Sequence, residues 1–259
     1  MAAGLSFMGG QYIEPVPFTH LLKTLAPAAA GRFASLCAVC RGWGAQRVCG
    51  DCVARFARVV PRCRSCALEV PAGVSVCGDC LRHPPPWEQA LAAVDYVHPW
   101  DGLLTLFKFH AALDLAPALT QRLFDAQGLD SASHHPGLLL PMPLNPVRLR
   151  ERGHNQAWEL ARRLGTLLNC PADAHLLLRP RDTSHQTTLA PSARAANVQG
   201  AFAVEPRRLA EVRGRELTLV DDVMTTGASA AEATRVLLQA GAARVQVWVV
   251  ARTPRPGSD

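Results

Sequence analysis

The sequence lacks the two features that would direct it into or across a membrane. No apolar run approaches the roughly 18 residues that a bilayer-spanning helix needs. The first residues also do not combine a basic segment with a long apolar one, as an export signal does. We therefore expect a cytoplasmic protein without a membrane span.

Acidic residues are fewer than basic ones, with 21 Asp and Glu against 27 Lys and Arg, so the net charge is +6. This charge permits contact with phosphate-rich ligands or nucleic acid but does not require it. Charged residues make up 19% of the chain and hydrophobic residues 49%, which indicates a globular protein rather than a disordered one. Its 259 residues suffice for one large domain or two modest ones.

Composition divides the chain into three zones. Residues 1–36 form an N-terminal segment whose sequence is weakly informative, although residues 18–33 favour a short surface helix. Residues 37–86 are rich in cysteine and end in a proline-rich segment that marks a boundary. Residues 87–259 alternate strand-like apolar runs with helical runs rich in Ala and Leu.

The third zone predicts an α/β fold. Strand-like runs alternate with helical ones, and Pro117 is expected to break or start a helix. This order indicates a mainly parallel sheet flanked by helices, in which ligands bind at the carboxyl ends of the strands. The expected strands are 90–97, 137–144, 200–204, 216–220 and 244–252, and the expected helices 101–124, 155–169 and 229–241.

Four Cys-x-x-Cys pairs in the second zone predict two metal sites. Each pair can turn two thiolates toward one metal, and two pairs complete a tetrahedral set of four sulfurs that suits Zn²⁺. Such a site has no open position, so its role would be structural. Pairing in sequence order is our first choice, although spacing leaves an interleaved arrangement, iron–sulfur ligation and redox pairs open. The expected ligands are Cys37, Cys40, Cys49 and Cys52 for one zinc and Cys63, Cys66, Cys77 and Cys80 for the other.

Arginines interleave with these cysteines, which suits contact with nucleic acid or a protein partner and equally suits a solvated surface. Cys170 stands alone in a helical segment and is expected to be an inert core thiol. The arginines are Arg41, Arg47, Arg55, Arg58, Arg62 and Arg64.

The stretch LTLVDDVMTTGAS, residues 217–229, carries the strongest ligand signal. Two adjacent carboxylates, Asp221 and Asp222, can accept hydrogen bonds from vicinal ribose hydroxyls and stabilise positive charge at an anomeric carbon. Amides at a turn and helix N-terminus bind phosphate, and Gly227 lets the backbone approach closely. The stretch therefore predicts a site for a phosphorylated sugar.

This stretch closely resembles the phosphoribosyl-pyrophosphate-binding motif of type I phosphoribosyltransferases. The resemblance implies that Asp221 and Asp222 hold the ribose hydroxyls and serve as catalytic residues. The 6-oxopurine enzymes carry an acid where this chain has Thr225, which argues against that subgroup. The motif's ligand-binding residues would be Asp221, Asp222, Val223, Met224, Thr225, Thr226, Gly227, Ala228 and Ser229.

The wider pattern resembles the ComF family of competence-associated, phosphoribosyltransferase-like proteins, over residues 37 to about 253. The cysteine pairs, residues 141–161, residues 183–202 and the acid motif occur in the family's order. His154 stands where relatives often have Phe, and Ala111 lies near a position where relatives often have Gly. Neither departure touches a proposed ligand contact. The resemblance implies a type I phosphoribosyltransferase-like parallel sheet with an N-terminal double zinc ribbon.

Basic side chains on two segments suit a pyrophosphate. Residues 143–156 follow a strand, where phosphoribosyltransferases bind pyrophosphate, and guanidinium groups suit that role. Residues 179–200 correspond by resemblance to the flexible catalytic loop; solvated surface loops remain the alternative for both segments. Asn155 is a candidate helix cap, and Lys108 faces either the site or solvent. The candidate pyrophosphate contacts are Arg148, Arg150, Arg152, Arg181 and Arg194.

Two functions follow as hypotheses. The first is an enzyme that transfers a phosphoribosyl group to a nucleobase or amine, with Mg²⁺ bound alongside phosphoribosyl pyrophosphate. No general base for the acceptor is evident in the sequence. The second is a non-catalytic competence protein that binds single-stranded DNA or a helicase-like partner and senses the metabolite. The link to DNA uptake comes from the family resemblance, and the two functions are compatible.

Overall fold

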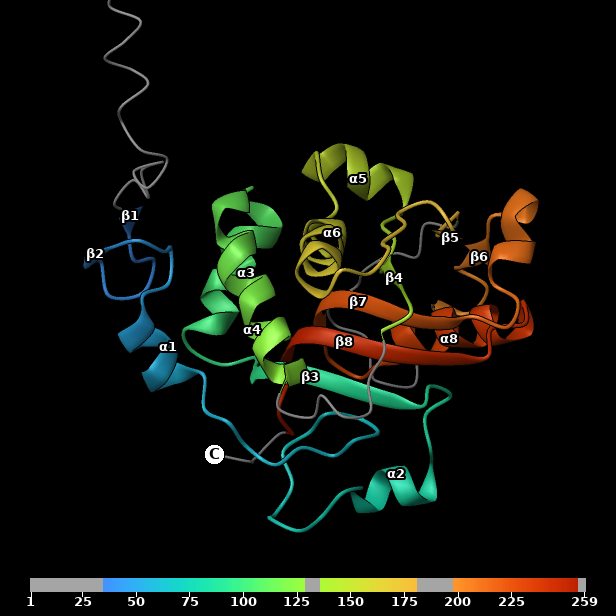
Figure 1. Ribbon diagram of the computed structural model, residues 1–259, viewed down its shortest axis with the longest axis horizontal. Coiled ribbons are helices and arrows are strands. Elements are labelled where there is room, and N and C mark those ends of the chain that lie inside the picture. Colours follow the sequence, from blue (N-terminus) through green and yellow to red (C-terminus); the bar gives the residue numbers. More distant parts are fainter. Residues whose placement is uncertain (1–34, 129–135, 181–197, 256–259) are drawn as a thin grey trace, which may run out of the picture. The chain divides into compact units, whose positions relative to one another are not determined.

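The structure is a computed structural model (Figure 1) that describes residues 35–128, 136–180 and 198–255. The described residues belong to one compact unit. Its centre is a four-stranded, wholly parallel sheet in the order β3-β8-β7-β4, which confirms the predicted α/β class. The strands are β3 Gln89–Asp95, β4 Leu138–Pro141, β7 Glu216–Met224 and β8 Arg244–Arg252.

The two central strands are buried on both faces. In β7 and β8 the apolar residues run almost continuously instead of alternating with polar ones, as expected for a parallel sheet with both faces covered. On β8, Val247 packs toward one face, and Trp248 and Val250 pack toward the other. β7 lies between β8 and β4, so its carboxyl end is surrounded by the loops that leave its neighbours.

Helices cover both faces (Figure 1). α3 and α4 join α6 in one hydrophobic cluster, whereas α8 packs against the other face together with a two-stranded ribbon. Pro117 lies in the first turn of α4, where its missing N–H costs nothing, and Asn155 caps α6 as predicted. The elements are α3 Trp100–Phe109, η2 Leu113–Leu115, α4 Ala116–Gly128, α5 Pro146–Arg152, α6 Gln156–Leu168, η3 Pro206–Glu211, α8 Ala228–Gln239, β5 Leu177–Leu178 and β6 Ala203–Val204.

Residues 35–86 contain little regular structure. Their elements are short: β1 Ser35–Leu36, β2 Trp43–Gly44, α1 Gly50–Phe56 and α2 Gly78–Arg82. The two cysteine-rich halves are built alike, since Cys49 and Cys77 each occupy the N-cap of the helix that follows. In the described part of the chain, no helix is long and apolar enough to cross a membrane.

Two local predictions were too short or of the wrong type. The strand predicted to end at Val220 continues through both acids to Met224, because Asp221, Val223 and Met224 still pair with β8. The segment expected as a loop after residue 144 contains the short helix α5. The helix expected at 18–33 lies outside the described residues, as does most of the loop at 179–200.

Candidate functional site

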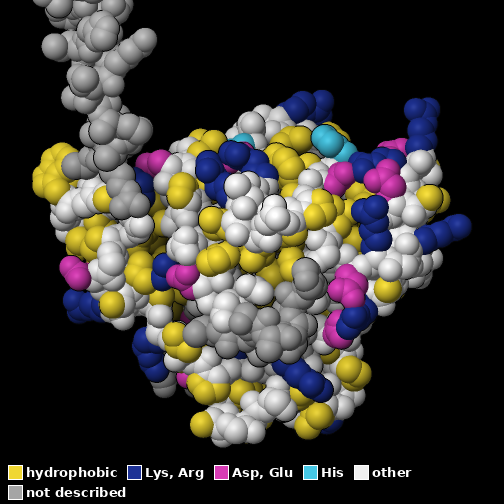
Figure 2. Space-filling model, in the orientation of Figure 1, with side chains coloured by type: hydrophobic (Ala, Val, Ile, Leu, Met, Phe, Trp, Pro, Cys, Tyr) yellow, Lys and Arg dark blue, Asp and Glu magenta, His cyan; other side chains and the backbone are white. Residues whose placement is uncertain are grey.

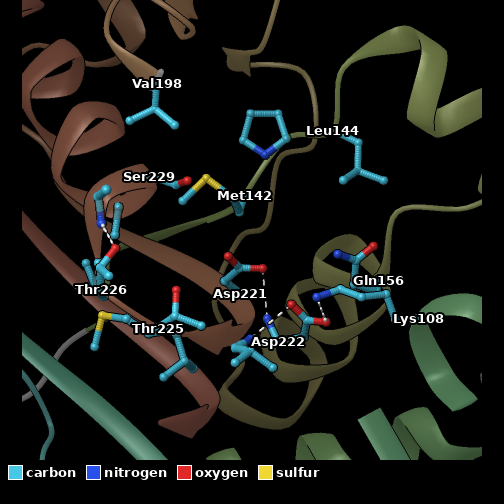
Figure 3. Close-up of a pocket in the computed structure, with 18 of the residues that line it drawn as sticks. Lys108, Met142, Leu144, Gln156, Val198, Asp221, Asp222, Thr225, Thr226 and Ser229 are labelled. Carbon is cyan, nitrogen blue, oxygen red and sulfur yellow. Dashed lines mark hydrogen bonds and ion pairs between the residues drawn. The ribbon is translucent and has the colours of Figure 1, made fainter. Parts of the chain in front are cut away.

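A cavity of about 370 Å³ lies at the carboxyl ends of β4 and β7 (Figure 3). Its wall joins the acid pair, the turn that follows, the start of α8, and side chains of α3, α5 and α6. This is the edge at which ligands bind in parallel sheets. The cavity is lined by Tyr96, Lys108, Met142, Pro143, Leu144, Arg148, Arg152, Gln156, Arg179, Val198, Val247, Val249 and every residue from Asp221 to Ala230.

The two carboxylates of the acid pair lie in different surroundings (Figure 3). Asp222 is 1% exposed, whereas Asp221 is half-buried and lines the cavity. The N–H of Asp222 donates to Asp221 Oδ1 at 2.9 Å, and the N–H of Val223 donates to Asp222 Oδ1 at 2.9 Å. Burial and the neighbouring Asp222 carboxylate raise the pKa of Asp221 well above its usual range, although Lys108 opposes this shift.

Lys108 of α3 is the counter-ion of the acid pair. Its Nζ lies 2.9 Å from Asp222 Oδ2, and its side chain is 24% exposed against 2% for that of Asp222. Burial lowers the pKa of Lys108, but the carboxylates of Asp222 and Asp221 outweigh burial and raise it overall. The sequence left open whether Lys108 faced the site, and the structure places it on the cavity wall.

The turn after β7, residues 225–229, is called the phosphate loop below. Gly227 is the N-cap of α8 and has φ +80°, a left-handed conformation that favours glycine. Thr225 and Thr226 are exposed, and the Thr226 hydroxyl accepts from the N–H of Ala228 at 3.4 Å. The first N–H groups of a helix have no partner within it, so this N-terminus suits an anion.

Only some of the candidate arginines are brought to the cavity. Arg148 and Arg152 line it from α5, whereas Arg150 is exposed and is not among the lining residues. Asn145 is the N-cap of α5: its buried side chain accepts from the N–H of Arg148 at 2.7 Å, and this cap orients the helix. Arg181 and Arg194 lie outside the described residues.

Three polar lining residues were not predicted from the sequence. Arg179 precedes the loop from which Arg181 was selected, and its guanidinium lies 5.3 Å from the Phe202 ring centroid. Gln156 accepts from Arg152 Nη1 at 3.1 Å, and Tyr96 directly follows β3. Tyr96 could have been found as the residue at a strand's carboxyl end, but no sequence signal distinguishes Gln156 from other helix residues.

The eight paired cysteines form two clusters in sequence order. In each, the four Sγ atoms lie within 4.8 Å of one another, which fits one metal ion per cluster and excludes the interleaved arrangement. The residue after each leading pair, Arg41 or Ala67, has a left-handed φ of 63° or 58°. We call Cys37, Cys40, Cys49 and Cys52 the first cysteine site, and Cys63, Cys66, Cys77 and Cys80 the second cysteine site.

Backbone donors favour a thiolate at the first cysteine of each site. The N–H of Cys49 donates to Cys37 Sγ at 3.4 Å, and that of Cys77 donates to Cys63 Sγ at 3.2 Å. Burial opposes ionisation, but these and neighbouring N–H groups lower the pKa of Cys37 to about 6 and that of Cys63 to about 7. A set of four cysteine thiolates is a common ligand set of a closed structural zinc site. Cys170 is separate and half-buried, and burial raises the pKa of its thiol.

Fold and site together define a class of protein. A parallel sheet with an acid pair and a Thr-Thr-Gly turn at its carboxyl edge, leading into a helix, is the arrangement of phosphoribosyltransferase-like α/β proteins. The cysteine-rich module precedes this domain in the chain.

Comparison with known proteins identifies the family. No family model matches the chain. The chain is 36% identical over 229 residues to DNA utilization protein YhgH of Escherichia coli O6:H1, covering 84% of this chain and 97% of that protein. It is 30% identical over 222 residues to competence protein F of Haemophilus influenzae, covering 83% and 96%. The chain therefore belongs to the ComF family, as its motifs predicted.

Solved structures give more distant likenesses. Glutamine phosphoribosylpyrophosphate amidotransferase from B. subtilis has a TM-score of 0.32 and 18% identity, covering 53% of this chain and 25% of that one. Trypanosoma cruzi hypoxanthine phosphoribosyl transferase has a TM-score of 0.33 and 15% identity, covering 55% and 74%.

Proposed function

We propose that this protein binds phosphoribosyl pyrophosphate in the cavity at the carboxyl edge of the sheet, and that it serves in DNA uptake or utilization. The observation that carries the first part is the gathering of the acid pair, the phosphate loop and two arginines of α5 around one cavity. The names of its relatives, competence protein F and DNA utilization protein, support the second part.

Each group suits one part of the ligand. The carboxylates of Asp221 and Asp222 accept hydrogen bonds from the ribose hydroxyls and stabilise positive charge that develops at the anomeric carbon. The N-terminus of α8 and the hydroxyls of the phosphate loop hold the 5-phosphate. Arg148 and Arg152 hold the pyrophosphate as cations, and Mg²⁺ bound with it would offset the charge of this leaving group.

Binding is tested by isothermal titration of phosphoribosyl pyrophosphate with Mg²⁺. We expect binding to the intact protein and its loss in the double variant Asp221→Asn/Asp222→Asn. The matched control is Asp125→Asn, which changes an exposed carboxylate on α4 that pairs with Arg122. Absence of binding to the intact protein would overturn the proposal.

The reaction proposed at this site is transfer of the phosphoribosyl group to a nucleobase or amine. It rests on the same acid pair, since stabilising an oxocarbenium-like carbon is useful only when the bond to pyrophosphate breaks. Pyrophosphate release, screened over a panel of nucleobases and amines, measures this reaction. Binding without release for any acceptor would leave the non-catalytic role, in which the cavity senses the metabolite.

A second function, binding of single-stranded DNA, is favoured by the surface of the cysteine module. Trp43 is 75% exposed there, and Arg41, Arg55, Arg58 and Arg64 are exposed as well. Exposed aromatic rings stack on bases, and arginines contact the phosphates. A gel shift across a salt series tests this function: we expect affinity to fall with salt and to fall further in Trp43→Ala. Affinity that is indifferent to salt and to Trp43→Ala would exclude it.

A further inference from the structure

Two side chains, Trp87 and Arg252, connect the second cysteine site with the phosphate loop. Trp87 connects them: its Nε1 donates to the carbonyl of Ser65, inside the leading cysteine pair, at 2.6 Å. The opposite side of its ring meets Gly227, where an added Cβ would lie 3.0 Å from Trp87 Cη2. Ala67 and Trp87 belong to the same buried cluster as Met224, which precedes the loop.

Arg252, the last residue of β8, makes a second connection. Its side chain is buried, and the residue is 7% exposed. Nε donates to the carbonyl of Cys66 at 2.8 Å, while Nη1 donates to the carbonyls of Met224 at 2.9 Å and of Thr225. One guanidinium therefore joins the carbonyl of Cys66, in the second cysteine site, to the carbonyls of Met224 and Thr225, where β7 passes into the phosphate loop.

The first cysteine site has different neighbours. Cys37 and Cys52 belong to the cluster that contains α3 and α4, and Trp100 Nε1 donates to the carbonyl of Phe56 at 2.8 Å. Arg47 pairs with Asp114 of η2. The two sites therefore offer a comparison within one chain. Each gathers four cysteine sulfurs, but among the described contacts the second alone shares Trp87 and Arg252 with the phosphate loop.

We propose that Arg252 is a positioning residue for the phosphate loop and that, with Trp87, it makes the order of this loop depend on the metal at the second cysteine site. A bound metal holds the Cys63–Cys66 turn, so the carbonyls of Ser65 and Cys66 stay aligned with their donors. Those donors then hold the loop that presents its N–H groups to the 5-phosphate. The ligand of the loop is that of the proposed function, on which this inference rests.

Hydrogen exchange of the amides at 225–229 measures the order of the loop without any ligand. In Arg252→Gln we expect this exchange to rise by about tenfold, with metal content unchanged and the amides of α6 protected as before. Arg252→Lys keeps the charge but not the planar fork, so it should not restore slow exchange. The matched control is Arg244→Gln at the other end of β8, where the arginine pairs with Glu216 on the surface.

The metal dependence is tested by Cys80→Ser against Cys40→Ser, with metal content measured for each. Both variants should lose one metal ion per chain, but only Cys80→Ser should speed exchange in the phosphate loop. Equal exchange in the two variants would overturn the proposal. If Cys80→Ser does not fold, Arg252→Gln and Trp87→Phe decide, since both keep every cysteine, and wild-type exchange in both would overturn it.

The two proposals fail in different ways. If the intact protein does not bind phosphoribosyl pyrophosphate but Cys80→Ser loosens the loop, the proposed function is wrong and the coupling stands. If the ligand binds but the rate of hydrogen exchange at 225–229 is the same in Arg252→Gln, Cys80→Ser and the wild type, the coupling is wrong and the proposed function stands.

Discussion

Asp221 and Asp222 are neighbours in sequence but have different electrostatic roles. Asp222 is buried and paired with Lys108, so part of its charge is already neutralised. Asp221 lines the cavity with a raised pKa, because burial and the adjacent carboxylate disfavour its charge. Without a ligand, two adjacent carboxylates are unfavourable, and hydroxyls of a bound ribose would stabilise them by donating hydrogen bonds. Binding sites commonly gain function at the expense of stability in this way.

The first prediction concerns the pH dependence of stability. Because folding raises the pKa of Asp221, the native state holds its proton to higher pH than the unfolded chain, and stability falls as pH rises through the folded pKa. Asp221→Asn removes this penalty. We expect the variant to exceed the wild type in free energy of unfolding at neutral pH, and the difference to shrink toward about pH 4. Urea unfolding over a pH series measures it; a difference independent of pH would contradict the assignment.

The second prediction concerns Lys108. Lys108→Met leaves the buried Asp222 carboxylate without its cation, which should cost about 2–4 kcal/mol of unfolding free energy. Adding Asp222→Asn removes the stranded charge, so the double variant should lose less than the sum of the two single variants. A double-mutant cycle by urea unfolding measures the coupling. Strict additivity would show that the ion pair contributes nothing.

At the scale of elements, the site depends on where strand, turn and helix meet. β7 continues through the acid pair because β8 still offers it backbone partners, so both carboxylates stand on a rigid strand rather than on a loop. The hydrophobic run predicted the strand but not its end, since pairing with β8 is a tertiary contact. Similarly, α5 was expected as a loop, and its Asn145 cap with proline at the next position is the signal that indicates a helix start.

The third prediction tests the turn. Gly227→Ala places a Cβ 3.0 Å from Trp87 Cη2 at a left-handed φ of 80°, which should lower the free energy of unfolding by about 1–2 kcal/mol and weaken ligand binding. Gly102→Ala is the control: its Cβ meets nothing within 4 Å and it lies in α3, where alanine favours the helix. A Gly227→Ala variant as stable as the Gly102→Ala variant would contradict the role of the turn.

At the scale of the whole molecule, the cysteine module is part of the core. Val48 and Cys52 pack in the cluster that contains Trp100, while Ala67 packs in the cluster beneath α8. Basic side chains are spread over several places on the face in Figure 2, with acidic ones between them. The positive net charge therefore does not gather into one patch on that face.

The fourth prediction concerns metal content. We expect close to two zinc ions per chain, and we expect a chelator that removes them to lower the melting temperature by about 10 °C or more, because each metal would cross-link a segment with little regular structure. Elemental analysis and thermal unfolding measure these. A content near one, or a melting temperature unchanged by chelation, would contradict two structural zinc sites.

The sequence by itself determined the family, the α/β class, the eight paired cysteines and the acid motif, because these depend on local spacing: Cys-x-x-Cys makes one turn, and Asp-Asp with Thr-Thr-Gly joins one strand to one helix. The tertiary structure decided which side chains from distant segments contact these motifs. Lys108 and Arg179 reach the cavity only because the sheet brings distant elements to one edge. Arg252 joins Cys66 to the phosphate loop because parallel β7 and β8 end side by side, and separation along the chain carries no trace of such a contact.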